Sequence, residues 1–422
     1  MASKTRYDPA KAVLENLPPP TGEDVSYWEK NLELTDKGKV VSSLRNLFLI
    51  LSRDARWEGA LGFDEFANQV VKCKPPPFDG GQLGPWGDVD DLRTSIWLSQ
   101  HYRVNAEKRI VIGAVVAAAN EARFHPVRQY LERLEWDRQS RLEGWLHEYL
   151  GARQSDYSRL VGLKFLVGAV ARVMRPGCKM DNVLILEGPQ GRWKSTALAT
   201  LAGQWFGDTP FTIGDKDAYL VIRGHLIYEL AELDALSRAE VSRAKAFFSS
   251  THDTFVPKYV AWATKIPRQT IFAGTVNQGT YLRDTTGNRR YWPVRIQRAD
   301  IEALARDRDQ LWAEAVVRFG EKTRWWVDAD ERELFEAEQG LRQIPDAFED
   351  VISFWATGKN SFTMEQVLHE CLQLDKSKWS HAEQTRVGHA LSALGFEHYE
   401  IGRRANPRYG YRRPEREPGE EG

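Results

Sequence analysis

The chain has 422 residues, 42% of them hydrophobic, and a formal net charge of −1. This length suits two or three domains, and this hydrophobic content excludes a wholly disordered chain. No run of about 18 apolar residues occurs, so we expect no membrane partner and a cytoplasmic protein. The three cysteines show no paired spacing, which argues against a disulfide framework and a structural zinc site.

The nearly neutral charge does not point to a polyanionic partner, but it does not exclude one. A local basic stripe can contact phosphates while acidic surfaces elsewhere balance the total charge. Nucleic-acid binding must therefore be judged from individual segments.

The first part of the chain changes from a polar to a helical pattern. Residues 1–25 are polar and contain several prolines, which predicts a flexible arm. Apolar residues recur at helical spacing through much of residues 26–180, for example in 106–124, so we expect a mostly helical region. Prolines and glycines in residues 72–87 predict a loop or domain joint.

The middle of the chain alternates apolar runs of strand length with helical segments. This alternation predicts a three-layer α/β sandwich with a mostly parallel sheet, the architecture of a P-loop NTPase, within an ATPase core and following helices at 181–343. Ligands of such sheets bind at the carboxyl ends of the strands. The expected strands are 182–186, 226–230, 270–275 and 291–296, and the expected helices are 194–206 and 237–248.

The last part of the chain has the pattern of a small separate module. Helix patterns at 364–372 and 381–394 are followed by a turn and an extended segment. This order suits a winged-helix module at 344–411. The charged residues 412–422 predict a disordered tail.

The stretch after the first expected strand has the composition of a phosphate-binding loop. Backbone N–H groups in such a loop and at the following helix N-terminus point at phosphates, Lys194 would reach the outer phosphates, and Ser195 would join the magnesium shell. We therefore expect ATP and Mg²⁺ as cofactors. The expected nucleotide-binding residues are Gly188, Pro189, Gln190, Gly191, Arg192, Trp193, Lys194, Ser195 and Thr196.

Trp193 departs from the pattern of such loops. In G-x-x-x-x-G-K-[ST] the residue before the lysine is glycine, which lets the backbone close on the phosphates without a side chain. A tryptophan is compatible with the loop if its backbone is unstrained and its ring points away, onto the adenine or a neighbouring subunit.

The second expected strand runs directly into acidic residues. We assign Glu229 to magnesium and Glu232 to polarising the attacking water, although the two roles are interchangeable at this point. The plainer alternative is a strand that leads into a solvated, acidic helix start.

Polar residues also follow the third strand and precede the fourth. Asn277 can orient the attacking water or touch the terminal phosphate, or it can be a simple turn residue. Arg289 and Arg290 could present a guanidinium to a phosphate of the same or a neighbouring subunit, as an arginine finger does. A surface basic pair is the alternative. The order of loop, acids, asparagine and paired arginines is less ambiguous than any one of them, because ring-forming ATPases have these parts in that order.

Other short sequence motifs flank these residues and occur in one consistent order. They are His125-Pro126-Val127-Arg128, Tyr130-Leu131, Trp136-Asp137, Arg141-Leu142, Arg175-Pro176-Gly177-Cys178-Lys179-Met180-Asp181, Glu187-Gly188-Pro189-Gln190-Gly191 with Lys194-Ser195, Asp215-Lys216-Asp217, Glu229-Leu230-Ala231-Glu232-Leu233-Asp234 and Gly287-Asn288-Arg289-Arg290-Tyr291-Trp292-Pro293-Val294.

In these motifs the chain resembles the virulence-associated E family of phage, plasmid and prophage proteins. The ATPase core of that family is similar to that of superfamily 3 viral helicases of the AAA+ class. The resemblance covers most of the chain. It implies an ATP-dependent DNA helicase or replication-initiation motor that assembles as a ring, expected to be a hexamer, in a bacterial host cell. The region before His125 is too short for a usual primase domain, so we expect any primase to be a separate partner.

A basic and aromatic segment at 254–268 suits a β-hairpin or a loop. In superfamily 3 helicases a hairpin at this place tracks DNA phosphates in the central channel. The candidates here for contact with single-stranded or forked DNA are Lys258, Tyr259, Lys265 and Arg268, with Trp262 nearby. Simple solvation of a hairpin, with Arg268 paired locally, is an equally weighted alternative. A second basic group lies at 403–413 and could bind duplex DNA, although a solvated tail is favoured.

Two other functions stay open from the sequence. One is a nucleotide-dependent assembly switch that binds DNA but barely hydrolyses ATP, with Trp193 weakening the loop. The other is a small-molecule P-loop kinase, which the asparagine strand and the late paired arginines disfavour.

Overall fold

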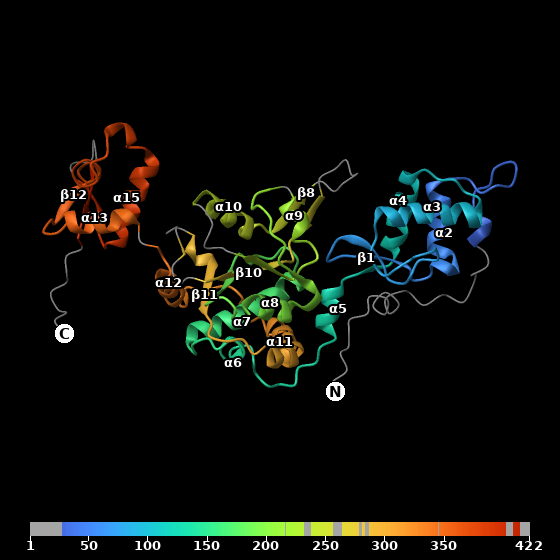
Figure 1. The fold of residues 1–422 in the computed structure, drawn as a ribbon, viewed down its shortest axis with the longest axis horizontal. Coiled ribbons are helices and arrows are strands. Elements are labelled where there is room, and N and C mark those ends of the chain that lie inside the picture. The colour runs from blue at the N-terminus through green and yellow to red at the C-terminus, as the bar shows by residue number, and fades with distance from the viewer. Residues whose placement is uncertain are drawn as a thin grey trace. The chain divides into compact units, whose positions relative to one another are not determined.

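The computed structural model describes residues 28–215, 217–231, 238–255, 264–277, 281–282, 287–344, 346–401 and 408–413 (Figure 1). Its backbone contacts divide the chain into a larger unit, with residues 1–278 and 290–335, and a smaller unit, with residues 279–289 and 336–422. The arm predicted at 1–25 lies outside the described residues. Within the described residues, no helix is both long and apolar enough to cross a bilayer.

The first part of the larger unit has its own core and combines three helices with a small sheet. Leu47, Ile50 and Trp97 are among its fully buried side chains. The sheet has the order β3-β2-β1-β4. Its elements are η1 (Trp28–Asn31), α2 (Leu44–Arg53), η2 (Ala55–Trp57), β1 (Leu61–Asp64), β2 (Gln69–Lys72), β3 (Gly84–Pro85), α3 (Asp88–Tyr102), α4 (Lys108–Glu121) and β4 (Arg123–Phe124).

This sheet differs from the expectation of a mostly helical region. β1 and β2 pair antiparallel, with Asp64 opposite Gln69. The Asp64 carboxylate accepts hydrogen bonds from the N–H groups of Phe66 and Ala67, at 2.8 and 3.0 Å, and Asn68 has a left-handed φ of 49°. Asp and Asn favour such a turn, which reverses the chain between two short strands that helical periodicity alone does not reveal.

The centre of the larger unit is a five-stranded parallel sheet with the order β11-β5-β10-β7-β6. This confirms the mostly parallel sheet predicted from the sequence. The four expected strands are present within one residue at each end, and β6 is an additional, very short strand. The strands are β5 (Val183–Glu187), β6 (Phe206–Gly207), β7 (Ile227–Ala231), β10 (Ile271–Val276) and β11 (Tyr291–Arg295).

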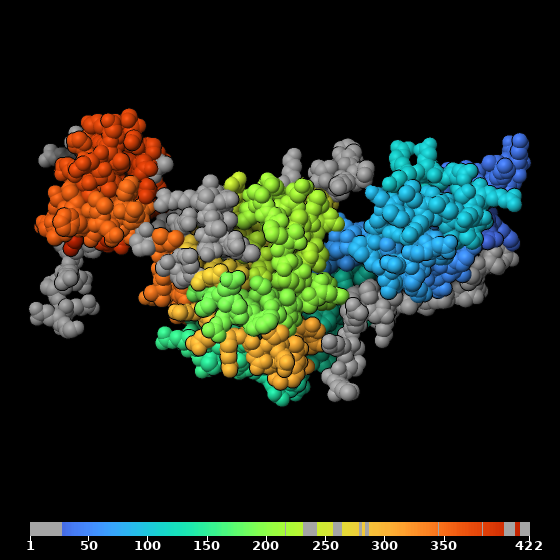
Figure 2. Space-filling model, in the orientation of Figure 1, coloured from blue at the N-terminus to red at the C-terminus, as the bar shows by residue number. Residues whose placement is uncertain are grey.

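Helices lie on both faces of this sheet and complete the three layers. The helical elements between residues 126 and 320 are α5 (Pro126–Glu132), α6 (Trp145–Glu148), α7 (Asp156–Met174), α8 (Lys194–Ala202) followed by η3 (Gly203–Trp205), α9 (Ala218–Val221), α10 (Arg238–Ser249), η5 (Asn288–Arg290) and α11 (Ile301–Gly320). In Figure 1, α7, α8 and α11 lie on one side of the strands and α10 on the other. Figure 2 shows the same segments with all their atoms as a space-filling model.

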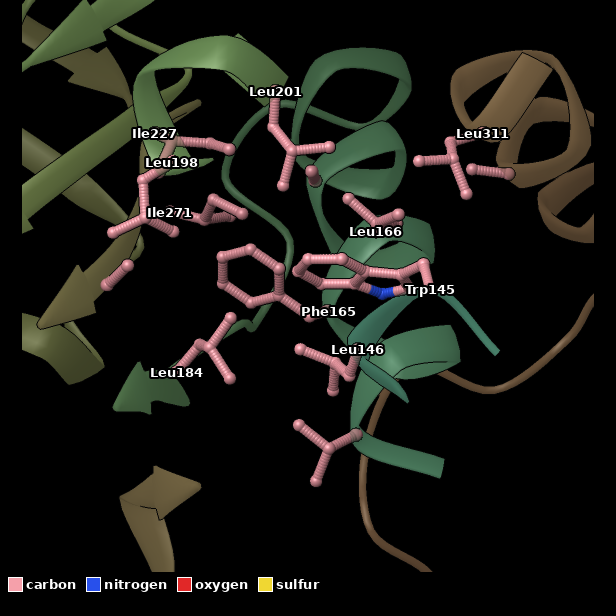
Figure 3. Close-up of a cluster of buried hydrophobic side chains, with 14 of the residues drawn as sticks. Trp145, Leu146, Phe165, Leu166, Leu184, Leu198, Leu201, Ile227, Ile271 and Leu311 are labelled. Atoms are coloured by element: carbon pink, nitrogen blue, oxygen red, sulfur yellow. The ribbon is translucent and has the colours of Figure 1, made fainter. Parts of the chain in front are cut away.

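Alternation along the strands assigns side chains to these two faces. Leu184, Ile227 and Ile271 point into the core that α7, α8 and α11 cover, where Phe165 and Trp145 are fully buried (Figure 3). Neighbouring strand positions point the other way, and there Phe272 contacts Phe247 and Phe248 of α10. Because side chains alternate with a period of two, Glu229, two residues after Ile227, lies on the α8 face.

The smaller unit contains helices and a three-stranded antiparallel sheet with the order β12-β14-β13. Its core includes Ile352, Val387 and Leu391. Arg412, which the sequence assigned to a disordered tail, is instead the last residue of β14. The elements from α12 onward are α12 (Arg332–Gly340), α13 (Ala347–Trp355), β12 (Ser361–Thr363), α14 (Met364–Gln366), the π-helical η6 (Val367–Cys371), η7 (Lys376–Lys378), α15 (His381–Ala393), β13 (Glu397–Ile401) and β14 (Arg408–Arg412).

Candidate functional site

The glycine loop connects the carboxyl end of β5 to the first residue of α8. A Cβ on Gly188, whose φ is +155°, would lie 2.9 Å from the Ile296 carbonyl oxygen, so only glycine fits there. Gly191 has a φ of +81°, and a Cβ there would meet no atom within 4 Å. Residues 189–193 are all exposed. The loop is therefore a solvent-facing turn at a helix N-terminus, the arrangement that binds anions through backbone N–H groups.

Trp193 is the N-cap residue of α8 and has left-handed backbone angles, φ 60° and ψ 27°. Its carbonyl accepts the N–H of Ala197 at 2.9 Å, and its side chain is 62% exposed. The left-handed conformation costs a residue with a Cβ roughly 1–2 kcal/mol. The ring thus points away from the protein interior, as the sequence required, but the backbone is strained.

Lys194 lies beneath the loop and is only 8% exposed. Its ammonium donates to the carbonyl oxygens of Gly188 and Pro189, at 2.5 and 3.0 Å, and to Asn277 Oδ1 at 3.1 Å. Burial lowers the pKa of Lys194, and the nearby Glu229 opposes this shift. The structure therefore brings Asn277, at the end of β10, to the lysine of the loop.

Glu229, on β7, is buried next to the start of α8. Its Oε1 accepts two hydrogen bonds of 2.7 Å each, from Ser195 Oγ and from Thr275 Oγ1. Its Oε2 is buried and has no hydrogen-bond partner among the described residues. Buried carboxylate oxygens are rarely left unpaired, and Mg²⁺ binds through one or two carboxylates together with phosphates and waters. Glu229 and Ser195 therefore fit a magnesium site.

Thr275 is a residue of this site that the motifs did not indicate. It lies on β10 two residues before Asn277 and shares the α8 face of the sheet with Glu229. The signal that could have found it is this spacing, because alternate residues of a strand point to the same face. Glu232, the other expected acid, lies outside the described residues.

The paired arginines have different environments. Arg290 is half-buried, donates from Nε to Ser249 Oγ at 2.9 Å and lies 3.7 Å from the Asp181 carboxylate. Arg289 is exposed. Arg290 thus contacts α10 and the segment before β5, and of the two arginines Arg289 is the more exposed.

The expected hairpin is present as β8 (His252–Phe255) and β9 (Thr264–Pro267), which pair antiparallel. Lys265 is exposed on β9. Lys258 and Tyr259 lie outside the described residues, as does Trp262.

Arg268, expected to contact DNA, is instead a buried structural residue. It is 1% exposed, and its Nε and Nη2 donate to Asp253 Oδ1 at 2.9 and 2.5 Å. Its third hydrogen bond goes to the carbonyl of Phe247 in α10. The guanidinium is therefore occupied at the base of the hairpin, as in the alternative reading that paired it locally.

These features place the chain in the class of three-layer α/β proteins whose polar site lies at the carboxyl edge of a parallel sheet. The family model of the virulence-associated protein E-like domain matches residues 131–344, just over half of the chain. The chain therefore belongs to the virulence-associated protein E-like family.

Among solved structures, the chain is similar to the C-terminal region of NrS-1. The apo structure of its residues 305–718 has 12% identity and a TM-score of 0.43, and the match covers 83% of this chain and 95% of that one. The A form apo structure has 10% identity and a TM-score of 0.44, with 88% and 99% covered. No curated protein sequence matches the chain.

Proposed function

We propose that this protein is an ATP-dependent DNA helicase or replication-initiation motor of a mobile element. The observation that supports this most is the convergence of Lys194, Ser195, Glu229 and Asn277 at the carboxyl ends of three adjacent strands. These are the residue types that phosphoryl transfer from a nucleotide requires, because its catalysis consists largely of positioning and charge stabilisation.

Each side chain has a distinct task in this proposal. Lys194 leaves the loop carbonyls and Asn277 to bind the outer phosphates, and Asn277 is then free to orient the attacking water. Ser195 and Glu229 hold Mg²⁺, which neutralises charge on the phosphate oxygens when bound. We assign the role of general base to Glu232.

The partners follow from the family and from the basic residues. The exposed Lys265 on β9 contacts the DNA backbone, together with Lys258 and Tyr259. Subunits assemble as a ring, which we expect to be a hexamer, so that Arg289 reaches the nucleotide of a neighbour. The smaller unit acts as a winged-helix module, and a separate primase completes the replication machinery in the cytoplasm of the host.

The test is ATP hydrolysis with and without forked DNA. We expect DNA to stimulate hydrolysis by the wild type, and we expect Lys194→Ala to abolish it. Lys37→Ala, which changes an exposed lysine far along the chain from the loop, is the matched control and should retain full activity. Wild-type protein that hydrolyses no ATP under any of these conditions would refute the motor.

The strained Trp193 and the buried Lys194 favour a second candidate, an assembly switch with little turnover. Lys194 must leave the loop carbonyls before it can reach a phosphate, and Trp193 lies where such loops have glycine. ATP-dependent assembly on DNA without phosphate release would support the switch. Stoichiometric phosphate transfer to a metabolite would refute both candidates in favour of a kinase.

A further inference from the structure

The hydrogen bonds of Glu229 are distributed unevenly between its two carboxylate oxygens. Oε1 accepts both hydroxyl donors, from Ser195 and Thr275, whereas Oε2 is buried and accepts none from the described residues. A carboxylate held at one oxygen can rotate little, so the other oxygen keeps a fixed direction. The free oxygen is the one available to a cation.

The two donors differ in what they can do when nucleotide binds. Ser195 is exposed in the first turn of α8, directly after the loop lysine, and its hydroxyl is the group that would bind magnesium. Its oxygen would coordinate the metal through a lone pair while its O–H donates to Glu229, so its position would depend on the metal as well as on the carboxylate. Thr275 is then the donor to Glu229 that has no part in binding the metal.

Thr275 is held much more firmly than Ser195. It belongs to β10, which is paired on both sides, opposite Leu186 of β5 and Ala231 of β7. Its β-branched side chain has restricted rotation about χ1. Glu229 lies opposite Ala273, so Thr275 is its diagonal neighbour on the same face of the sheet, within reach of a glutamate side chain. Its hydroxyl therefore holds Oε1 from a position that depends neither on the metal nor on α8.

We propose that Thr275 is a positioning residue that keeps Glu229 aimed at the magnesium ion throughout the nucleotide cycle. This inference rests on the proposed function, because it assigns a role within the same nucleotide site. Outer-shell hydrogen bonds of this kind typically change metal affinity about 10- to 100-fold when they are removed. Loss of the Thr275 hydroxyl should therefore raise the Mg²⁺ concentration needed for tight nucleotide binding. The affinity for nucleotide without metal should stay the same.

The experiment measures binding of a fluorescent ATP analogue to the full chain, once in excess EDTA and once across a Mg²⁺ titration. Thr275→Val removes the hydroxyl and keeps the shape of the side chain, and Thr275→Ser keeps the hydroxyl. We expect Thr275→Val to bind the analogue like the wild type in EDTA but to need about 10- to 100-fold more Mg²⁺ for tight binding. Thr275→Ser should behave like the wild type.

Thr200→Val is the matched control for the threonine-to-valine change. Thr200 lies in α8, where its hydroxyl donates to the Thr196 carbonyl at 2.7 Å. It should leave the Mg²⁺ dependence unchanged. Binding of Mn²⁺ with the unlabelled nucleotide, followed by electron paramagnetic resonance, gives a second measure of metal affinity that does not depend on turnover.

Three outcomes are decisive. An unchanged Mg²⁺ dependence in Thr275→Val would overturn the positioning role and leave the nucleotide site intact. An equal defect in Thr275→Ser would also overturn it, because the hydroxyl would not be the cause. A wild-type protein that binds the analogue under neither condition would overturn the proposed function itself, and this role with it.

Discussion

Trp193 is a bulky residue at a position of the loop where the backbone conformation suits glycine better. Its left-handed φ of 60° places it where a side chain is unfavourable, while the 62% exposure of the indole shows that the ring does not stabilise the fold by burial. Strain of this kind persists where the surrounding structure imposes it, often at sites of function. The adjacent Lys194 is buried under the same loop, so the strained residue lies next to the lysine of the candidate nucleotide site.

Replacing Trp193 with glycine should remove this strain. The gain of roughly 1–2 kcal/mol is partly offset by the greater freedom of glycine in the unfolded chain, so we expect Trp193→Gly to change stability by about 0 to +1 kcal/mol. Nucleotide affinity should be preserved or raised. Thermal unfolding and binding of the ATP analogue check the two expectations. Loss of binding would instead make the indole part of the nucleotide site.

At the scale of elements, the β8–β9 hairpin carries one arginine and one lysine that have opposite roles. Arg268 is buried at its base and paired with Asp253, whereas Lys265 is exposed on the strand before the base. A buried ion pair is strongly destabilised by loss of one partner, because the other charge remains uncompensated. An exposed lysine can be lost with little effect on stability.

Separate variants of the two residues should therefore give opposite results. Arg268→Ala should lower the free energy of unfolding by about 3–5 kcal/mol, because Asp253 stays buried without its partner. Lys265→Ala should change stability by less than about 0.5 kcal/mol. It should also weaken DNA binding at low salt and reduce the slope of log affinity against log salt by about 1. Denaturant unfolding and binding titrations at several salt concentrations measure these effects. An unchanged salt slope in Lys265→Ala would remove it from the DNA contacts.

At the scale of the whole molecule, the proposed ring requires a site shared between subunits. Arg289 is the arginine to test, because it is exposed whereas Arg290 is half-buried. A heterologous interface would combine the loop of one subunit with the arginine of the next.

Mixing two inactive variants tests this arrangement. Lys194→Ala and Arg289→Ala should each be inactive alone, but a 1:1 mixture should recover up to about a quarter of wild-type hydrolysis, because a random heterologous interface has that chance of containing both intact residues. Mixtures at several ratios, assayed after exchange of subunits, measure the recovery. If no mixture recovers activity, the two residues do not act across an interface.

The sequence by itself determined the local elements and their order. Apolar runs of strand length predicted β5, β7, β10 and β11, and glycines with Lys194 and Ser195 predicted the loop, because backbone conformation and side-chain chemistry act over a few residues. The hairpin before β10 followed from the same kind of pattern. The family resemblance added an expected function, that of a DNA helicase or replication-initiation motor, and this function stays a proposal.

Only the tertiary structure decided which side chains meet. It placed β10 between β5 and β7, and this brought Asn277 to Lys194 and Thr275 to Glu229. It also turned Arg268 into the interior, although the sequence around it looks like an exposed basic hairpin. Strand order and burial depend on contacts between segments far apart in the chain, so a local sequence pattern does not predict them. Strands, loops and helices depend mainly on neighbouring residues, so a local pattern does predict them.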